Sequence, residues 1–343
     1  MKILVINLGG LGDMLFSVPF LRGLRDRYKT AEITLLTVTN SYGIIENQKL
    51  FDKVVELPAG SSDIRRIFVF KYLRLFSGLR KQKYDLSVNL RTVVSLNSAI
   101  KTALMLFAAG ARKNTGRGNS GTTFIYETAV VEKKEYKKHE IDYHAELAEK
   151  LGFKPRGKIQ IKLEKANFEF ASDFLVKNKI SPKAKIIVMN HEARWETKRW
   201  PPVNYLRLME KLIKFKNIKI ILLSNKDIAF AQIVKKIFRK VVILKNDDIK
   251  NIAAVIKKAS VLLTNDTGIV HVGAALNVKT VGLYGPSDPY LAGPYLPSNR
   301  KIIINKSAHC APCNKLECSS LECFKKITVE EVYSAIIKFV GAK

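Results

Sequence analysis

Several features are scarce or missing in this chain of 343 residues, and each absence excludes a class of protein. No run of about 18 apolar residues occurs, because the longest candidate, Thr102–Ala111, is too short, so no helix should span a membrane. Glycines and an aspartate interrupt the apolar N-terminus after Asn7. This pattern is typical of a first core strand and turn, not of a signal peptide. We therefore expect a cytoplasmic protein.

Acidic residues are few, 30 Asp and Glu against 59 Lys and Arg, and the formal net charge is +29. A hydrophobic fraction of 47% excludes a wholly disordered basic chain. The excess charge is spread over both halves of the chain and matches no nucleic-acid-binding motif, so we predict no nucleic-acid partner. Two interpretations remain: a solvated, Lys-rich surface, or a protein that works beside anionic partners.

One segment, Arg65–Lys83, interleaves basic residues with large apolar ones. As a helix, it could lie on an anionic bilayer. It could also be an ordinary domain helix whose apolar stripe faces the core, and we favour this second interpretation.

Short apolar runs alternate with amphipathic stretches along most of the chain, which predicts an α/β fold with parallel sheets covered by helices on both faces. The length and a break at 181–183 predict two such domains, residues 1–170 and 171–325. The predicted strands are Lys2–Asn7, Glu32–Val38, Lys53–Leu57, Asp85–Leu90, Lys185–Asn190, Lys219–Ser224, Val241–Leu244, Val261–Thr264 and Lys279–Leu283. Between 116 and 165 the alternation weakens and predicts loops with one closing helix, Asp142–Leu151.

A first polar loop, Gly9 to Asp13, follows the first predicted strand. Glycines let the backbone turn tightly and approach a ligand, and the start of the next helix favours anions. Asp13 could cap that helix or act as a base. The loop does not match G-x-G-x-x-G, no acid ends the second predicted strand, and no G-K-[ST] follows. The pattern therefore disfavours a nicotinamide dehydrogenase and a P-loop protein.

Two more polar loops follow predicted strands in the second half of the chain. Residues 191–201 combine cations with aromatic groups, and Lys198 could neutralise a diphosphate there. The alternative is a Trp-anchored loop with surface ion pairs. Residues 265–271 open a helix, where Thr267 and Gly268 offer backbone N–H groups suited to phosphate, with His271 one turn further on.

Together these motifs resemble glycosyltransferase family 9, the lipopolysaccharide heptosyltransferase family, over nearly the whole chain. The resemblance rests on Gly12 and Asp13 followed by Pro19 and Leu24, on 198–201, on 265–276 and on 283–294. The last two blocks are highly specific in this order and spacing. The resemblance implies two facing Rossmann-like domains of the GT-B type, with a C-terminal helix in residues 326–343 that returns to the first domain.

The same resemblance implies an inverting glycosyltransferase that needs no cofactor for catalysis. Its expected substrates are a nucleotide-diphospho-sugar, with ADP-heptose favoured, bound by the second domain, and an anionic glycolipid, the lipopolysaccharide core or a related acceptor, bound by the first. Such an enzyme would work at the cytoplasmic face of the inner membrane. Asp13 is the expected base and Lys198 the expected partner of the leaving diphosphate. The expected substrate-binding residues are Gly10, Gly12, Asp227, Asp266, Thr267, Gly268 and His271.

One departure from the family pattern is Ala193-Arg194, which stands where small hydroxyl residues often precede the lysine. Alternatives within the fold are a transferase for another nucleotide-sugar, a nucleotide-sugar epimerase, and a non-catalytic basic protein that binds a membrane surface. The intact Asp13, Lys198 and 266–271 motif favours an enzyme.

All four cysteines lie close together near the C-terminus, with C-x2-C-x4-C-x4-C spacing: Cys310, Cys313, Cys318 and Cys323. Clustering in a cytoplasmic chain suggests a structural metal site, either zinc or an iron–sulfur cluster. Free thiols or one disulfide are the alternatives, because gaps of four residues are not a standard zinc pattern.

Overall fold

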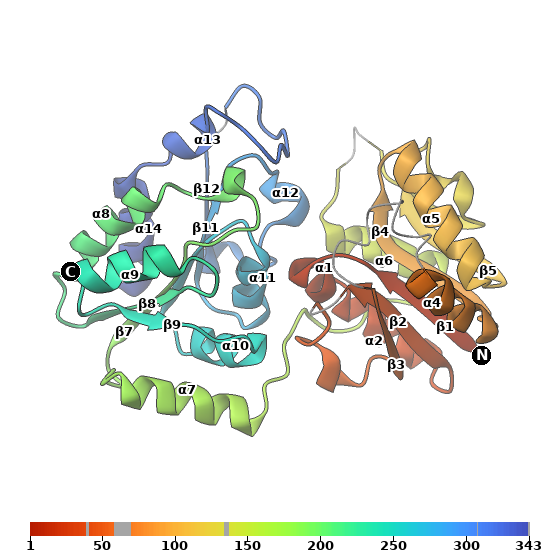
Figure 1. The fold of residues 1–343 in the computed structure, drawn as a ribbon, viewed down its shortest axis with the longest axis horizontal. Coiled ribbons are helices and arrows are strands. Elements are labelled where there is room, and N and C mark those ends of the chain that lie inside the picture. Colours follow the sequence, from red (N-terminus) through yellow and green to blue (C-terminus); the bar gives the residue numbers. More distant parts are fainter. Residues whose placement is uncertain (39–40, 58–69, 134–136, 307, 342–343) are drawn as a thin grey trace. The chain divides into compact units, whose positions relative to one another are not determined.

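The computed structural model describes residues 1–38, 41–57, 70–133, 137–306 and 308–341, with residues 70–73 described by their backbone alone. The chain divides into two compact units, Met1–Ile159 and Gln160–Lys343. Each unit is built on one six-stranded sheet (Figure 1). The expected α/β class with two Rossmann-like domains is confirmed.

All strands of the first sheet run parallel, in the order β3-β2-β1-β4-β5-β6. They span Lys2–Asn7 (β1), Glu32–Val38 (β2), Lys53–Leu57 (β3), Leu86–Val93 (β4), Lys113–Gly118 (β5) and Thr128–Val131 (β6). The strand order reverses between β1 and β4. In parallel sheets, ligands bind outside the carboxyl ends of the strands at such a switch point.

The second sheet repeats this plan, in the order β12-β11-β10-β7-β8-β9, with all strands parallel. Its strands are Lys185–Asn190 (β7), Ile218–Leu223 (β8), Val242–Leu244 (β9), Val261–Asn265 (β10), Thr280–Tyr284 (β11) and Lys301–Asn305 (β12). Here the order reverses between β7 and β10, which marks the corresponding switch point.

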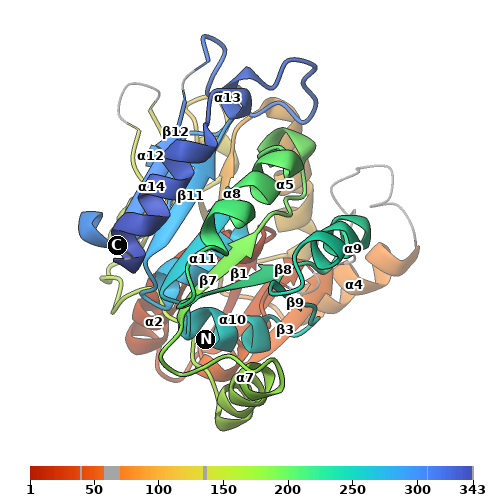
Figure 2. The same cartoon turned by 90° about the vertical axis from the view of Figure 1, so that its left-hand side faces the viewer.

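Helices cover both sheets (Figures 1 and 2). Those of the first unit are Leu11–Phe16 (α1), Val18–Arg27 (α2), Phe70–Lys81 (α4), Leu96–Ala109 (α5) and Glu140–Lys150 (α6). Those of the second are Lys165–Lys177 (α7), Pro202–Leu212 (α8), Ile228–Ile237 (α9), Ile249–Lys257 (α10), Gly268–Ala275 (α11), Pro289–Ala292 (α12), Glu322–Lys325 (α13) and Val329–Val340 (α14). Short 3₁₀ turns lie at Glu46–Gln48 (η1), Thr123–Ile125 (η2), Glu196–Lys198 (η3) and Ser298–Arg300 (η4).

The predicted strands are confirmed to within three residues at each end, because buried parallel strands carry continuous apolar runs. Strands β5, β6 and β12 were not predicted, and the expectation of loops after residue 116 is wrong for β5 and β6. The β5 sequence, KNTGRG, has no apolar side chain, so no hydrophobic pattern marks it. Its buried positions are filled by Thr115, two glycines and Arg117.

The C-terminal helix is α14. It is part of the second unit, where it packs on α8 and on β10, β11 and β12. Figure 2 shows α14 and α8 side by side over that sheet. Val332, Ile336 and Phe339 on the apolar stripe of α14 join the second core, which explains this placement. The unit boundary also lies earlier than residue 170, because α7 packs on α10 of the second unit.

Part of the basic segment 65–83 falls outside the described residues, namely 65–69. Within α4, Leu79 is buried in the first core and Leu75 and Phe76 pack against it. Arg74 and Arg80 are exposed. The described part therefore confirms an ordinary domain helix. In the portion of the chain that the structure describes, no helix has the length and hydropathy needed to cross a bilayer.

Candidate active site

The polar loop after β1 wraps around the side chain of Asp13. The backbone N–H of Gly10 donates to Asp13 Oδ2 at 2.8 Å, and Asn7 Nδ2 donates to the Asp13 carbonyl at 3.1 Å. A Cβ at position 9 would collide with the Cβ and the carboxylate of Asp13, so only glycine fits there. Gly12 lies within α1. Gly10, Gly12 and Asp13 thus lie together in this loop and at the start of α1.

The sequence did not predict the second partner of Asp13, which is Arg91. Arg91 lies on β4, the neighbour of β1 across the switch point. Its Nη1 forms an ion pair with Asp13 Oδ1, and the two side chains are 43% and 27% exposed, respectively. The backbone N–H of Arg91 donates to Asn89 Oδ1 at 3.1 Å. One sequence feature could have indicated Arg91 as a site residue: it directly follows the predicted strand Asp85–Leu90, at the carboxyl end of the sheet.

A buried histidine from α6 ties the two elements of this pair together. His144 Nδ1 lies 3.2 Å from the carbonyl of Phe16, the last residue of α1, and Nε2 lies 3.1 Å from the carbonyl of Leu90 on β4. Burial lowers the pKa of His144 to about 3, so the ring is neutral at pH 7. A neutral imidazole has one N–H, so only one of these contacts is a hydrogen bond in either tautomer.

A fully buried arginine, Arg117, lies on β5, the neighbour of β4 in the sheet. Arg117 on β5 donates to Thr92 Oγ1 at 2.7 Å, lies 3.1 Å from Glu132 Oε1 and pairs with the Glu140 carboxylate. Its guanidinium also lies over the Tyr143 ring. Burial raises the pKa of Glu132, although Arg117 opposes that shift. Arg117 thus connects β5 to Thr92, the residue after Arg91 on β4, and to two acids.

In the second unit, Lys198 and Asp266 form the corresponding pair at the switch point between β7 and β10. Lys198 Nζ donates to Asp266 Oδ2 at 2.5 Å, and Ser287 Oγ donates to the same oxygen at 2.5 Å. The ammonium also lies 4.8 Å from the centroid of the Trp195 ring. The side chains of Lys198 and Asp266 are 20% and 11% exposed. Ser287, which the sequence did not single out, belongs to the 283–289 motif.

Thr267 and Gly268 begin α11 directly after Asp266. Thr267 is the N-cap, and its Oγ1 accepts the backbone N–H of Ile269 at 3.3 Å and Asn190 Nδ2 at 3.1 Å. The N-terminus of a helix presents free N–H groups and a partial positive charge, which together favour an anion. His271 lies one turn along α11 and is 6% exposed. These residues therefore meet the Lys198–Asp266 pair at one helix end.

Asn265, another residue not singled out from the sequence, joins the loops around this helix end. Its Oδ1 accepts the backbone N–H of Trp200 and the hydroxyl of Tyr205, both at 3.2 Å, and its Nδ2 donates to the His191 carbonyl at 2.8 Å. Burial raises the pKa of Tyr205, so the hydroxyl remains a donor. Asn265 thereby positions the segment that carries Lys198.

Asp227 lies at the start of α9, after β8, and caps that helix by accepting the Phe230 N–H at 3.0 Å. Glu192 Oε1 accepts the backbone N–H groups of Lys226 and Asp227 at 2.7 and 2.8 Å. His191 Nε2 lies 3.6 Å from Asp227 Oδ2, and burial lowers the pKa of His191. Asp227 therefore reaches the loop after β7 through Glu192 and His191.

The four cysteines are free thiols that line one small pocket, together with Thr197 and Pro286. Their loop is attached to the second site, because Cys313 N–H donates to the Pro286 carbonyl at 2.9 Å and Thr197 Oγ1 donates to the Lys315 carbonyl at 2.8 Å. Hydrogen bonds from Leu321 and Ser320 lower the pKa of Cys318. Across the described residues, no three His, Cys, Asp or Glu side chains are arranged to hold a metal ion, so the structure does not support the expected metal site.

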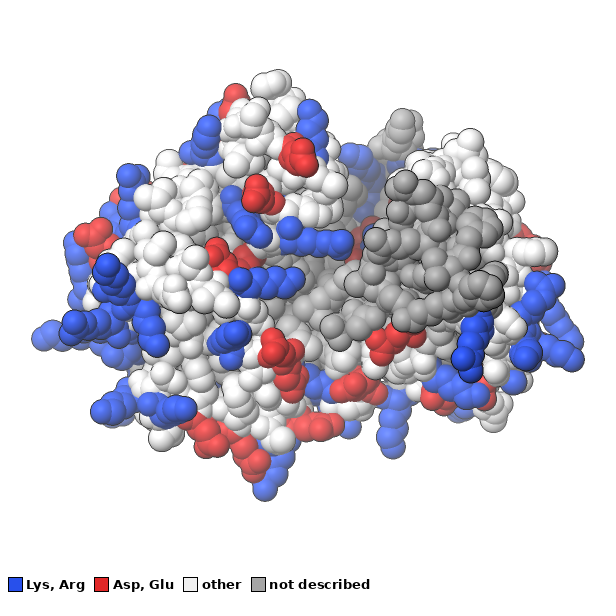
Figure 3. Space-filling model, in the orientation of Figure 1, with Lys and Arg blue, Asp and Glu red and all other residues white. Residues whose placement is uncertain are grey.

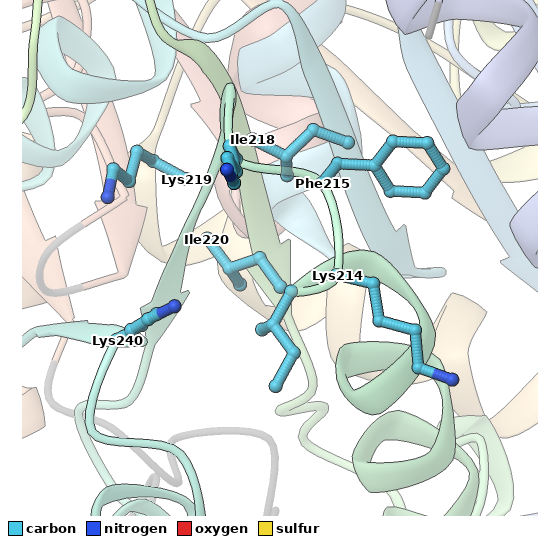
Figure 4. A pocket seen from close by; sticks show the side chains of 8 residues that line it. Lys214, Phe215, Ile218, Lys219, Ile220 and Lys240 are labelled. Carbon is cyan, nitrogen blue, oxygen red and sulfur yellow. The ribbon is translucent and has the colours of Figure 1, made fainter. Parts of the chain in front are cut away.

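A separate pocket of about 330 Å³ lies between the end of α8, the start of β8 and Lys240. Lys214, Lys216, Lys219 and Lys240 surround an apolar floor that includes Ile218 and Ile220. In Figure 4 the side chains of Lys214 and Lys219 point to opposite sides of the view. Figure 3 shows basic side chains spread widely over the second unit, which fits the even charge of the sequence.

The family model of glycosyltransferase family 9 (heptosyltransferase) matches residues 72–323. Lipopolysaccharide heptosyltransferase 2 of Escherichia coli is 25% identical over 328 residues, 90% of each chain. A family 9 glycosyl transferase structure from Veillonella parvula superposes with a TM-score of 0.78 at 20% identity, covering 99% of this chain and 97% of that one. The E. coli ADP-heptose lps heptosyltransferase II structure has a TM-score of 0.73 at 22% identity, covering 99% and 98%.

The solved structures confirm the GT-B fold, with its two Rossmann-like domains. The family match spans the 198–201, 265–271 and 283–289 motifs and therefore includes the whole second site. Because this match covers well over half of the chain, the protein is a glycosyltransferase and belongs to glycosyltransferase family 9, the heptosyltransferases.

Proposed function

We propose that this enzyme transfers heptose from ADP-heptose, with inversion, to the core of lipopolysaccharide or to a related lipid-linked acceptor. The observation that carries the proposal is the second site, where a lysine, a serine and the start of α11 surround Asp266. A solved heptosyltransferase of E. coli, similar in fold, was determined with ADP-2-deoxy-2-fluoro heptose. The full-length relatives are named lipopolysaccharide heptosyltransferases.

The second unit binds the donor in this proposal. Lys198 neutralises the diphosphate, and the N–H groups at Thr267 and Gly268 donate to its oxygens. These groups meet the charge that grows on the diphosphate as its bond to the anomeric carbon breaks, which lowers the barrier to transfer. Asp266 holds Lys198 in place. His271 contacts a phosphate of the donor, and Asp227 contacts the nucleoside.

The first unit binds the acceptor. Asp13 takes the proton of the acceptor hydroxyl as its oxygen attacks the anomeric carbon. The carbon–oxygen bond to the diphosphate breaks, and ADP leaves with the electron pair. Attack from the face opposite the leaving group inverts the anomeric configuration.

Replacement of the two acting groups tests this mechanism. With ADP-heptose and heptose-deficient lipopolysaccharide, Asp13→Asn should lower kcat by roughly 10²–10⁴-fold, because the base is lost. Lys198→Ala should lower kcat by roughly 10²–10³-fold, because the leaving group loses its cation. Lys211→Ala is the matched control, because Lys211 pairs with Glu330 at the surface of the same unit and should leave transfer unchanged.

Near-normal turnover of a folded Asp13→Asn variant would remove Asp13 as the base. Failure of the wild-type enzyme with ADP-heptose would reject the donor. Arg194 favours a second candidate, a transferase for another nucleotide-sugar, because a bulky cation stands where the expected family pattern has small hydroxyl residues. A thermal-shift panel of ADP-, UDP- and GDP-sugars separates the two: the largest shift with ADP-heptose supports the first, and a larger shift with another sugar nucleotide supports the second.

For the cysteine loop we propose a structural role and no part in catalysis. Support comes from its hydrogen bonds to Pro286 and Thr197, which flank Ser287 and Lys198. A structural zinc or iron–sulfur group in this loop is the finer proposal, and four clustered thiols are the chemistry it would need. Metal analysis of protein purified without added metal tests it: one equivalent supports the group, whereas less than a tenth with four titratable thiols rejects it.

The site of action in this proposal is the cytoplasmic face of the inner membrane, because the acceptor is anchored in lipid while the donor is soluble. Attachment is peripheral. Flotation with acceptor-containing vesicles measures it, and recovery of the protein only in the soluble fraction would contradict it.

A further inference from the structure

Both carboxylate oxygens of Asp13 are already engaged. Oδ2 accepts the Gly10 N–H at 2.8 Å, and Oδ1 holds the guanidinium of Arg91. An oxygen that is to accept a proton from an incoming hydroxyl must lie within hydrogen-bond reach of that hydroxyl. Each carboxylate oxygen keeps a second lone pair, but the hydroxyl would share its oxygen with a group that is already bound there. Opening one of the two contacts gives the hydroxyl an unshared oxygen.

The two contacts differ in how easily they open. The Gly10 contact spans three residues and belongs to the turn that closes over the carboxylate, where a Cβ at position 9 would not fit. The Arg91 contact joins residues 78 positions apart through a long side chain that is 43% exposed. An ion pair as exposed as this contributes little stability. The Arg91 contact is therefore the one that opens.

A guanidinium that leaves Asp13 needs another anion. A second acid near Arg91 is Glu132, which already pairs with Arg117 and accepts a hydrogen bond from Thr92 Oγ1 at 2.8 Å. Glu132 is therefore already engaged by other partners. A guanidinium binds phosphate and carboxylate groups through two parallel hydrogen bonds, which makes an incoming anion a strong competitor.

We infer that Arg91 is an acceptor-sensing residue: it exchanges Asp13 for a phosphate or carboxylate group of the acceptor, and this exchange frees Asp13 Oδ1 to take the hydroxyl proton. The inference rests on the proposed function and assigns a specificity to the first unit. An anionic acceptor opens the pair, whereas a neutral acceptor or water leaves it closed. The closed pair therefore protects the donor from hydrolysis, in which water would attack the anomeric carbon and pass its proton to Asp13.

The exchange makes an unusual prediction for binding without any turnover. In Asp13→Asn, Arg91 no longer has an anionic partner to give up, so heptose-deficient lipopolysaccharide should bind several-fold more tightly than it binds the wild type. In Arg91→Gln, binding should weaken roughly tenfold or more, because a charge-assisted contact is lost. Unchanged or weaker binding in Asp13→Asn would overturn the exchange.

Kinetics supply the second readout. Arg91→Gln should raise the KM for the anionic acceptor roughly tenfold or more while kcat falls less than about threefold, and it should speed donor hydrolysis in the absence of acceptor. Arg91→Lys should raise the KM less than Arg91→Gln does, because lysine keeps the positive charge but cannot form two parallel hydrogen bonds. The contrary outcome uses a second acceptor, the same molecule with its phosphates removed and its carboxylates reduced. If Arg91→Gln lowers kcat equally with both acceptors and leaves KM unchanged, Arg91 does not bind the acceptor anion and only orients Asp13.

Arg156→Gln is the matched control, because Arg156 pairs with Asp26 on the same unit and is 70% exposed, and it should change neither binding nor hydrolysis. An ADP thermal shift equal to that of the wild type shows that each variant is folded. The binding assay needs no donor, so it tests the exchange even if ADP-heptose proves to be the wrong donor. Failure of the proposed function appears instead as absence of transfer by the wild type.

Discussion

The two units carry the same kind of pair at the same place in their sheets. In the first, an acid after β1 meets a cation on β4; in the second, a cation after β7 meets an acid after β10. The burial of the pairs differs: Asp13 and Arg91 are 27% and 43% exposed, whereas Asp266 and Lys198 are 11% and 20% exposed. In the proposed mechanism the group that acts on the substrate also differs: an acid in the first unit and a cation in the second.

This difference teaches that a shared fold fixes where an ion pair forms, while burial decides whether it can open. The Lys198–Asp266 pair is held further by Ser287 and by the Asp266 N–H, which donates to the Leu283 carbonyl at 3.0 Å. The Asp13–Arg91 pair has solvent on its guanidinium side. The Lys198–Asp266 pair therefore stays closed and positions its cation, whereas the Asp13–Arg91 pair can open.

The largest effect on stability should come from Arg117, which is fully buried. Arg117→Ala should lower the free energy of unfolding by about 3–5 kcal/mol, since it leaves Glu132 and Glu140 without their buried partner. Arg91→Gln, in the exposed pair beside it, should cost at most about 1 kcal/mol. Urea denaturation followed by circular dichroism measures both changes. Equal losses of unfolding free energy would contradict the contrast between buried Arg117 and exposed Arg91.

Asp266→Asn sharpens the comparison of the two acids. The variant should weaken ADP binding roughly tenfold, because Lys198 loses the charge-assisted contact that positions it. Asp13→Asn is expected to do the opposite for the acceptor. Calorimetric titration with ADP provides the measurement, and tighter ADP binding by the Asp266→Asn variant would show that the buried pair opens as the exposed one does.

His144 should make the stability of the first unit depend on pH. Its pKa is lowered from 6.5 to about 3 in the folded state, so the unfolded chain binds the additional proton between these values. Stability contributed by the neutral ring is present above pH 6.5 and is lost as pH falls, by about 1.4 kcal/mol per pH unit. His144→Gln should remove this slope in urea titrations at pH 4–6.5, and an unchanged slope would assign the loss to other groups.

Small effects on stability should come from the helix caps, which compare the units directly. Thr267→Ala removes the cap of α11 and the contact with Asn190, and should cost about 1–2 kcal/mol. Ser95→Ala removes the exposed cap of α5 in the first unit and should cost about 1 kcal/mol or less. Only the Thr267 change should also raise the KM for the donor. A donor KM that rises equally in both variants would point to general loosening.

Much of the fold was predictable because the apolar runs of buried parallel strands, such as KILVIN and KIIVMN, stand out from polar loops. Gly110, which ends α5, adopts a left-handed conformation with φ of 64°, as glycine commonly does at the end of a helix. By contrast, β5 was not predictable, because Arg117 is buried by pairing and not by hydrophobicity. The break between α1 and α2 at Ser17 places Pro19 in a first turn, where proline is tolerated.

The sequence by itself determined the two βα series, the loops that carry Asp13, Lys198 and 265–271, and the family. These features are local: periodicity, glycines and short motifs specify them within a few residues. Only the tertiary structure decided that Arg91 meets Asp13, that Asn265 joins the loop of Lys198, and that α14 belongs to the second unit. The physical reason is that β1 neighbours β4, and β7 neighbours β10, only after the intervening strands have crossed over, so these contacts join residues that no local pattern connects.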